Sequence, residues 1–145
     1  MLKNDPPIIT QESFNNSISE VWKAITNCEQ MKAWFFYNIP NFEAKIGFKT
    51  QFNVKSENRD FLHLWKVIDL VPNKKITTNW KYQNIKGDSN VTFELNEDQK
   101  GTTLTVTCEI LEDFPQNIPE FKTESCQAGW NYFIKDRLKN YLTLL

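Results

Sequence analysis

The chain has 145 residues, a length that favours one domain, residues 1–145, with a substantial hydrophobic core. Its net charge is −1 with both signs interspersed, so we expect no nucleic-acid partner and no attraction to an anionic membrane. No apolar run is long enough to span a membrane, and the first residues lack a secretory signal. The three cysteines, Cys28, Cys108 and Cys126, show no paired spacing. The sequence therefore predicts a cytoplasmic protein with reduced thiols.

The first predicted elements are a strand at residues 8–14 and two short helices. Ser17 and Glu20 have the spacing of a capping box, in which the side chain of each bonds the backbone amide of the other. Asn27 repeats the capping signal before a second short helix or turn. Because such short helices are unstable alone, their apolar residues should pack against a sheet. These residues are Val21, Trp22, Ile25, Met31, Trp34 and Phe35.

Residues 41–110 have the pattern of an antiparallel meander of about six strands. Polar clusters at 56–60, 72–75, 86–89 and 96–101 separate the apolar runs, and Gly47 predicts a tight turn between segments 42–44 and 48–52. Apolar residues alternate with threonine and glutamate in the last two strands, which predicts one covered and one solvated face. The aromatic side chains expected on the covered face are Phe52, Trp65, Trp80, Tyr82 and Phe93.

The end of the chain, residues 129–142 and counted back to about Pro119, predicts one long helix. On a wheel of 100° per residue its apolar face comprises Trp130, Phe133, Ile134, Leu138, Tyr141 and Leu145. Arg137 falls close to the middle of this face. Gly129 costs about 1 kcal/mol relative to alanine inside a helix, so we expect it to mark a close approach to another element.

Strands followed by one helix indicate an α+β fold: a curved antiparallel sheet wrapped around the long C-terminal helix, with two short helices after the first strand. A long sheet curls because its strands twist. A curled sheet around a helix leaves room for a cavity between the two, where apolar ligands bind.

Motifs spread over nearly the whole chain resemble one protein family. They are Phe14, Val21-Trp22, Ile25-Thr26, Glu29, Trp34-Phe35, Gly47-Phe48, the run from Val67 to Pro72, Ile76, Trp80, the run from Gly101 to Thr105, and Gly129-Trp130. In this order they resemble the START-like, helix-grip (Bet v 1-like, SRPBCC) superfamily, and within it the activator of heat-shock-protein-90 ATPase homologue family. The resemblance implies the helix-grip fold, in a superfamily that includes lipid and hormone binders, polyketide cyclases and stand-alone bacterial domains.

The sequence departs from the family pattern at two places. Trp65 stands where the family usually has glycine, so we expect a smaller cavity than the resemblance implies. The terminal helix of the family usually repeats leucine four and seven residues after the tryptophan, where this chain has Ile134 and Arg137.

Two polar residues have both a functional and a structural interpretation. Arg137 could bind a carboxylate or phosphate group of an apolar ligand, since a guanidinium can donate two parallel hydrogen bonds. Alternatively, its aliphatic carbons pack against the protein, and its guanidinium reaches solvent or pairs with a carboxylate of the sheet. His63, the only histidine, could act as a general base, but no local motif supplies a partner, so a hydrogen-bonded structural role is the alternative.

The remaining candidates are possible lining residues of the predicted cavity. Cys126 is placed either at the cavity mouth or on ordinary helix surface, whereas Cys108 is expected in the core. The full set of cavity candidates is Trp34, Phe52, His63, Trp65, Trp80, Tyr82, Phe93, Cys126, Trp130, Phe133 and Arg137. No catalytic motif, cofactor motif or metal-ligand spacing is present, so we expect no cofactor and no metal.

Three hypotheses for function follow. The first is non-enzymatic binding of a small, mostly hydrophobic ligand between the sheet and the C-terminal helix. The second, implied by the resemblance, is a regulatory domain that interacts with a chaperone. The third is a cyclase- or hydrolase-like enzyme acting in the cavity through Arg137, His63 or Tyr82. The sequence leaves the ligand and the oligomeric state open.

Overall fold

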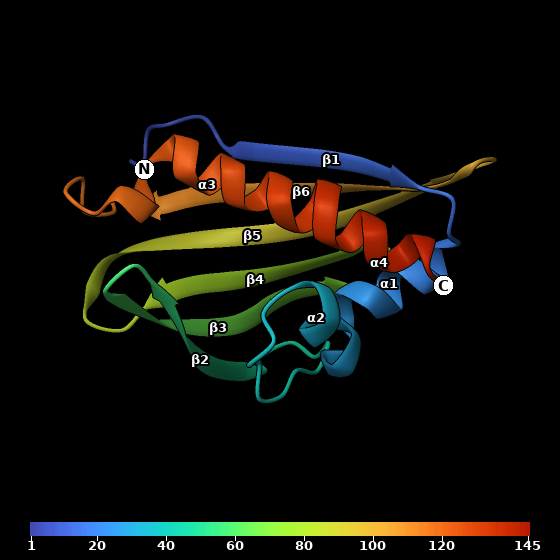
Figure 1. Ribbon diagram of the computed structural model, residues 1–145, viewed down its shortest axis with the longest axis horizontal. Helices are drawn as coiled ribbons and strands as arrows, with labels where there is room; N and C mark the ends of the chain where they lie inside the picture. The colour runs from blue at the N-terminus through green and yellow to red at the C-terminus, as the bar shows by residue number, and fades with distance from the viewer.

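A six-stranded antiparallel sheet, in the order β1-β6-β5-β4-β3-β2, carries one long helical segment across one face (Figure 1). The computed structural model describes residues 1–145. The strands are β1 (Ile8–Phe14), β2 (Lys49–Ser56), β3 (Arg59–Val71), β4 (Lys75–Tyr82), β5 (Ile85–Asp98) and β6 (Gly101–Glu112). The helical segments are α1 (Ile18–Thr26), α2 (Cys28–Trp34), η1 (Pro119–Phe121), α3 (Thr123–Trp130), η2 (Asn131–Leu138) and α4 (Lys139–Thr143). The predicted α+β helix-grip architecture is confirmed.

The two short helices begin where their capping signals predict. Ser17 and Glu20 form the complete capping box of α1, with the Ser17 hydroxyl accepting from the Glu20 amide at 3.2 Å. Asn27 caps α2 by accepting from the Gln30 amide at 3.1 Å. In Figure 1 α1 lies beside the C-terminal end of the long helical segment and packs on β5 and β6, whereas α2 contacts η2.

The strands follow the predicted alternation, but the meander has one strand fewer than expected. Five strands follow the short helices, and segment 42–44 is a loop. Phe42 is buried there, with its ring edge-on to Trp65 at a centroid distance of 6.2 Å. A buried aromatic residue in a loop leaves the same sequence pattern as a short strand, which explains the wrong prediction. Gly47 does form the predicted turn, with φ of +92°.

The last helical segment runs continuously from α3 through the π-helical η2 to α4, and it packs along β1. Its buried residues recur at every fourth position: Trp130, Ile134, Leu138 and Leu142. A π-helix closes each turn with an i→i+5 hydrogen bond, so its turn is wider than the 3.6 residues that the wheel assumes. The predicted face is therefore partly wrong: Arg137 is exposed, and Leu145 is 61% exposed.

Candidate functional site

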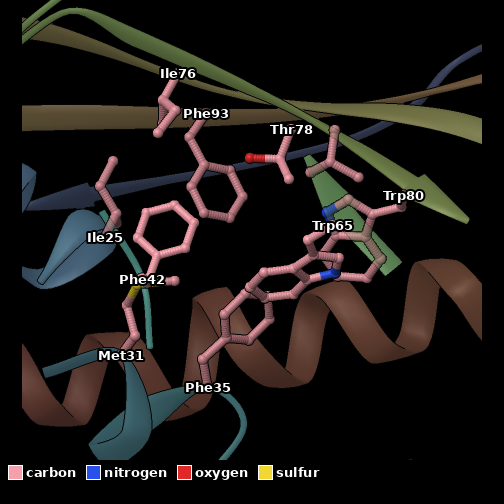
Figure 2. Close-up of a pocket in the computed structure, with 10 residues that line it drawn as sticks. Ile25, Met31, Phe35, Phe42, Trp65, Ile76, Thr78, Trp80 and Phe93 are labelled. Carbon is pink, nitrogen blue, oxygen red and sulfur yellow. The ribbon is translucent and has the colours of Figure 1, made fainter. Parts of the chain in front are cut away.

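Two separate spaces lie between the sheet and the helices, and the first is closed. It is the core cavity, shown in Figure 2 and lined by Ile25, Met31, Phe35, Phe42, Trp65, Ile76, Thr78, Trp80, Val91 and Phe93. Its volume is about 20 Å³, room for little more than one water molecule. Side chains from the short helices and from β3, β4 and β5 converge on it and fill it. The ring of Phe35 stacks on Trp34 at 4.7 Å and meets Phe133 edge-on at 4.9 Å.

The second space is an open groove of about 420 Å³ between β2, β3 and β4 on one side and η1, α3 and η2 on the other. Ten of its fifteen lining residues are hydrophobic. They are Met1, Phe36, Val54, Lys55, Ser56, Phe61, His63, Trp80, Tyr82, Glu120, Phe121, Cys126, Gly129, Trp130 and Phe133. This groove is the candidate functional site.

His63 supplies a polar atom in the wall of the groove. The inward face of β3 carries it between Phe61 and Trp65, and the side chain is only 6% exposed. Its Nδ1 lies 2.9 Å from the carbonyl oxygen of Phe61. Because a carbonyl only accepts, Nδ1 carries the proton and Nε2 keeps a free lone pair. Burial lowers the pKa of His63 from 6.5 to about 4, so the ring is neutral at pH 7.

Tyr82 is the second polar group of the inner groove. Its ring meets His63 edge-on at a centroid distance of 4.7 Å. Burial raises the pKa of Tyr82, so the phenol keeps its proton and can donate a hydrogen bond. His63 and Tyr82 thus offer one neutral acceptor and one neutral donor in the inner part of the groove, and Lys55, Ser56 and Glu120 are the other polar residues of the lining.

Glu120, which lines the groove, is held in an ion pair. Arg59 of β3 donates from Nε and Nη2 to the two carboxylate oxygens of Glu120, at 2.8 and 3.0 Å. The hydrogen bond from Arg59 lowers the pKa of Glu120 to about 2. Since this two-pronged contact occupies the carboxylate, Glu120 is not a free acid or base, and the pair instead ties η1 to the sheet.

Gly129 leaves the groove open on the helix side. A Cβ atom added to it would meet no other atom within 4 Å. The expectation that Gly129 marks a close approach to another element is therefore wrong. The missing side chain instead contributes to the free space of the groove, which Gly129 lines.

The structure divides the predicted cavity residues between the two spaces. Those that line the groove are His63, Trp80, Tyr82, Cys126, Trp130 and Phe133. Trp65 and Phe93 line the core cavity instead, together with Trp80, which borders both spaces. Trp34 is fully buried, with its indole donating to the Ala24 carbonyl at 2.7 Å, and Phe52 stacks on His63 at 5.1 Å without lining either space.

Arg137 lies outside both spaces, on the exposed side of η2. Its Nη2 donates to the carbonyl oxygen of Ala33 at 2.9 Å, and its Nη1 to the hydroxyl of Tyr132 at 3.3 Å. Ala33 is in the last turn of α2, where carbonyl groups lack helical partners. The guanidinium therefore joins two helices rather than facing a ligand space.

Sequence reasoning did not select nine of the groove residues. They are Met1, Phe36, Val54, Lys55, Ser56, Phe61, Glu120, Phe121 and Gly129. Phe61 shares the inward face of β3 with His63, so strand alternation alone could have included it. Glu120 and Phe121 belong to the short 3-10 helix η1, which has no periodic signal. Gly129 stood out in the sequence, but its role required the structure.

The molecule has neither a cluster of metal-ligating side chains nor an apolar helix of membrane-spanning length. No three histidine, cysteine, aspartate or glutamate side chains come close enough together to hold a metal ion. No helix has both the length and the apolarity that crossing a membrane requires.

Comparison with known proteins identifies one family and many similar folds. The model of the family described as activator of Hsp90 ATPase homolog 1-like protein matches residues 15–143. A comparison with the curated proteins gives no match.

Three solved structures illustrate the fold similarity. DynU16, from the dynemicin biosynthetic locus, has a TM-score of 0.77 at 22% identity, over 96% of this chain but only 48% of its own. CV1439 from Chromobacterium violaceum has a TM-score of 0.75 at 18% identity, over 95% of each chain. The Aha1 dimer from Colwellia psychrerythraea has a TM-score of 0.72 at 19% identity, over 95% of this chain and 96% of its own. At these identities the similarity establishes the fold alone.

Proposed function

The chain belongs to the activator of Hsp90 ATPase homolog 1-like family, and from the groove that it builds on this fold we propose that it binds a small, mostly hydrophobic ligand. The ligand occupies the groove between the sheet and the C-terminal helical segment. The observation that carries the proposal is the size and lining of the groove. Its volume of about 420 Å³ is within the range of small-molecule sites, roughly 300–1,000 Å³, and ten of fifteen lining residues are hydrophobic.

The polar groups of the groove restrict the chemistry of the ligand. His63 presents the Nε2 lone pair and Tyr82 a phenolic hydroxyl, both uncharged at pH 7. The Glu120 carboxylate is occupied by Arg59. Beside His63 and Tyr82 a charged ligand group would lose its hydration without finding an opposite charge, which is costly; the lining residues with charged side chains are Lys55, which is exposed, and Glu120. The ligand class that fits is therefore a neutral aromatic or aliphatic molecule with one hydroxyl group, which donates to His63 Nε2 and accepts from Tyr82.

A fluorescence titration with 2-naphthol tests this proposal, because Trp80 and Trp130 both line the groove and report on its occupancy. We expect saturable quenching of the wild-type protein, and weaker binding of naphthalene, which lacks the hydroxyl. Gly129→Leu places a side chain in the groove and should weaken the binding of 2-naphthol. Ala128→Leu, one position earlier and exposed, is the matched control and should bind like wild type.

Equal 2-naphthol affinity of the Gly129→Leu and wild-type proteins would contradict binding in the groove. Mass spectrometry of solvent extracts of freshly purified protein complements the titration. It should detect a co-purifying compound of the predicted class.

The family description itself supports a second candidate function, interaction with a chaperone. A pull-down with purified Hsp90 distinguishes the two candidates. Chaperone binding that persists in Gly129→Leu, together with an empty groove in the solvent extracts, would favour the interaction role over ligand binding.

A further inference from the structure

A hollow of about 420 Å³ lies on the solvent-exposed face of the sheet, over strands β2, β3 and β4. Side chains alternate between the two faces of a strand, so Leu64 and Lys66, on either side of the buried Trp65, point to this outer face. The hollow shares only Trp65 with the core cavity and no residue with the groove. We call it the lysine hollow, and its lining residues are Lys49, Thr50, Gln51, Leu64, Trp65, Lys66, Asn79 and Lys81.

The register of the strands brings three lysines together in the lysine hollow. Lys49 of β2 lies directly opposite Lys66 of β3. Lys66 lies opposite Asn79 of β4, and Lys81 is two places further along that strand, so it is a diagonal neighbour of Lys66. Directly opposite side chains have Cβ atoms about 5 Å apart, and diagonal neighbours are about 7–8 Å apart. Because all three lysines are exposed and have flexible side chains, their ammonium groups can converge on one small anion.

The positive charge of the lysine hollow is only partly compensated. Lys81 Nζ lies 3.8 Å from one carboxylate oxygen of Asp88, and the other oxygen accepts from Asn79 Nδ2 at 2.7 Å. Lys49 and Lys66 take part in none of the ion pairs of the protein. No aspartate or glutamate lines the hollow. Three ammonium groups therefore face one neighbouring carboxylate.

This arrangement is unfavourable for the protein alone, because like charges directly opposite each other destabilise an antiparallel pair of strands. Elsewhere the chain brings opposite charges together, as in the pairs of Lys75 with Asp69 at 2.9 Å and of Arg59 with Glu120 at 2.8 Å. Local conflicts of this kind are expected where residues serve a function rather than stability. A concave surface with charges of one sign also concentrates the electrostatic potential and attracts ions of the opposite sign.

We propose that the lysine hollow is a second binding site, specific for an oligophosphate group. A chain of linked phosphates carries several adjacent negative charges, and lysine ammonium groups donate charge-assisted hydrogen bonds to phosphate oxygens. A single carboxylate would neutralise only one of the three lysines. The volume of about 420 Å³ is within the range of small-molecule sites. The half-buried Leu64 gives the site an apolar floor, on which an organic group attached to the phosphates can lie. The oligophosphate group is therefore either a free inorganic chain or part of a nucleotide.

Isothermal titration calorimetry of the full chain with tripolyphosphate, ATP and inorganic phosphate, at low salt and without divalent metal ions, tests the proposal. We expect one saturable site per chain for tripolyphosphate, with weaker binding at higher salt because the contacts are exposed. Inorganic phosphate should bind more weakly, since it carries fewer charges. Tighter binding of ATP than of tripolyphosphate would support the nucleotide as the source, whereas equal or weaker binding of ATP would support the free chain. Absence of saturable binding of both compounds at low salt would overturn the proposal.

Two lysine variants distinguish the site from the overall charge of the protein. Lys66→Gln removes the central lysine and should weaken tripolyphosphate binding about tenfold, the size expected for one charged hydrogen bond. Lys86→Gln, on β5 and outside the lysine hollow, is the matched control, because it removes the same charge from an exposed position. It should bind like wild type. Equal losses of affinity in the two variants would show that binding follows net charge and would overturn the proposal.

The stability of Lys66→Gln provides a second readout. Since the substitution removes one of two opposite like charges, it should raise the melting temperature of the ligand-free protein by about 1–3 °C at low salt. Tripolyphosphate should stabilise the wild-type protein against heat and have a smaller effect on the variant. A melting temperature of Lys66→Gln below that of wild type would contradict the unfavourable lysine pair on which the proposal rests.

The oligophosphate site is independent of hydrophobic ligand binding in the groove and fails separately from it. Tripolyphosphate binding without 2-naphthol binding would support the lysine hollow and contradict the proposed ligand of the groove. Binding of 2-naphthol without tripolyphosphate binding would do the reverse. Where both bind, Lys66→Gln should leave the affinity for 2-naphthol unchanged, because the two sites have no lining residue in common.

Discussion

His63 shows how burial sets the chemistry of a single residue. In the folded protein its pKa is about 4, against an ordinary value of 6.5. Between these two pH values the unfolded chain binds a proton that the folded protein does not. The free energy of unfolding therefore has its full value above pH 6.5 and decreases as the pH falls towards 4.

We predict that His63 contributes a loss of about 3 kcal/mol in stability between pH 7 and pH 4, since each pKa unit corresponds to about 1.4 kcal/mol. Urea unfolding at pH 7, 6, 5 and 4 measures the loss. His63→Gln, which can still donate to the Phe61 carbonyl, should have a flatter pH dependence. Carboxylates also titrate in this range, so the difference between wild type and variant isolates the histidine. Identical slopes for the two proteins would contradict the prediction.

At the scale of single residues, the sequence predicts the position of a side chain better than its protonation state. Strand alternation places His63 on the covered face of β3, as observed. Its neutrality depends on the packing of Phe52 and Tyr82 around the ring, which come from β2 and β4. No local pattern contains that information.

At the scale of elements, the sequence predicts most boundaries of helices and strands correctly. It predicts the buried face of the last helical segment only in part. Capping residues locate the starts of α1 and α2, and alternation locates the strands. The sequence predicts the last helical segment but not the π-helical geometry of η2. Over this segment a spacing of four, from Trp130 to Leu142, keeps residues on the buried side. A wheel of 100° per residue therefore placed Arg137 in the apolar face.

Arg137 joins η2 to α2 by a hydrogen bond, and its substitution distinguishes this structural role from a role in ligand binding. Arg137→Ala removes the hydrogen bond to the Ala33 carbonyl in the last turn of α2. We expect a loss of less than about 1 kcal/mol in urea unfolding, because the contact is exposed. Arg137→Lys should recover part of it. Affinity for 2-naphthol should not change in either variant; a clear loss of affinity at unchanged stability would show that the guanidinium acts on the ligand.

At the scale of the whole molecule, one aromatic layer separates a filled core from an open groove. Trp80 borders both spaces, with Trp65 4.9 Å away on the core side and Trp130 5.5 Å away on the groove side. The sequence predicts that all three point inward. It cannot predict which space each one borders, because the division depends on how the helices and the loop after α2 fill the interior. The family resemblance did indicate that Trp65 reduces the cavity, and the space beside it is about 20 Å³.

Trp65 therefore fills a site that a smaller residue would open to ligands. We predict that Trp65→Ala lowers the free energy of unfolding by about 3 kcal/mol, which is the lower end of the usual range for such truncations. The loss is at the lower end because the substitution also removes the buried, unpaired Nε1 of Trp65, which is unfavourable in the wild-type protein. Indole should bind in the new cavity and raise the melting temperature of the variant.

Trp22→Ala is the control for this rescue. Trp22 is only half-buried on α1, so its removal leaves no enclosed cavity, and indole should not raise the melting temperature of this variant. Equal effects of indole on both variants would indicate non-specific binding. Rescue of Trp65→Ala alone, with 2-naphthol binding retained in the same variant, would demonstrate that the core cavity and the groove are independent sites. Loss of 2-naphthol binding would instead mean that Trp65 supports the groove through Trp80, and that the two spaces act as one.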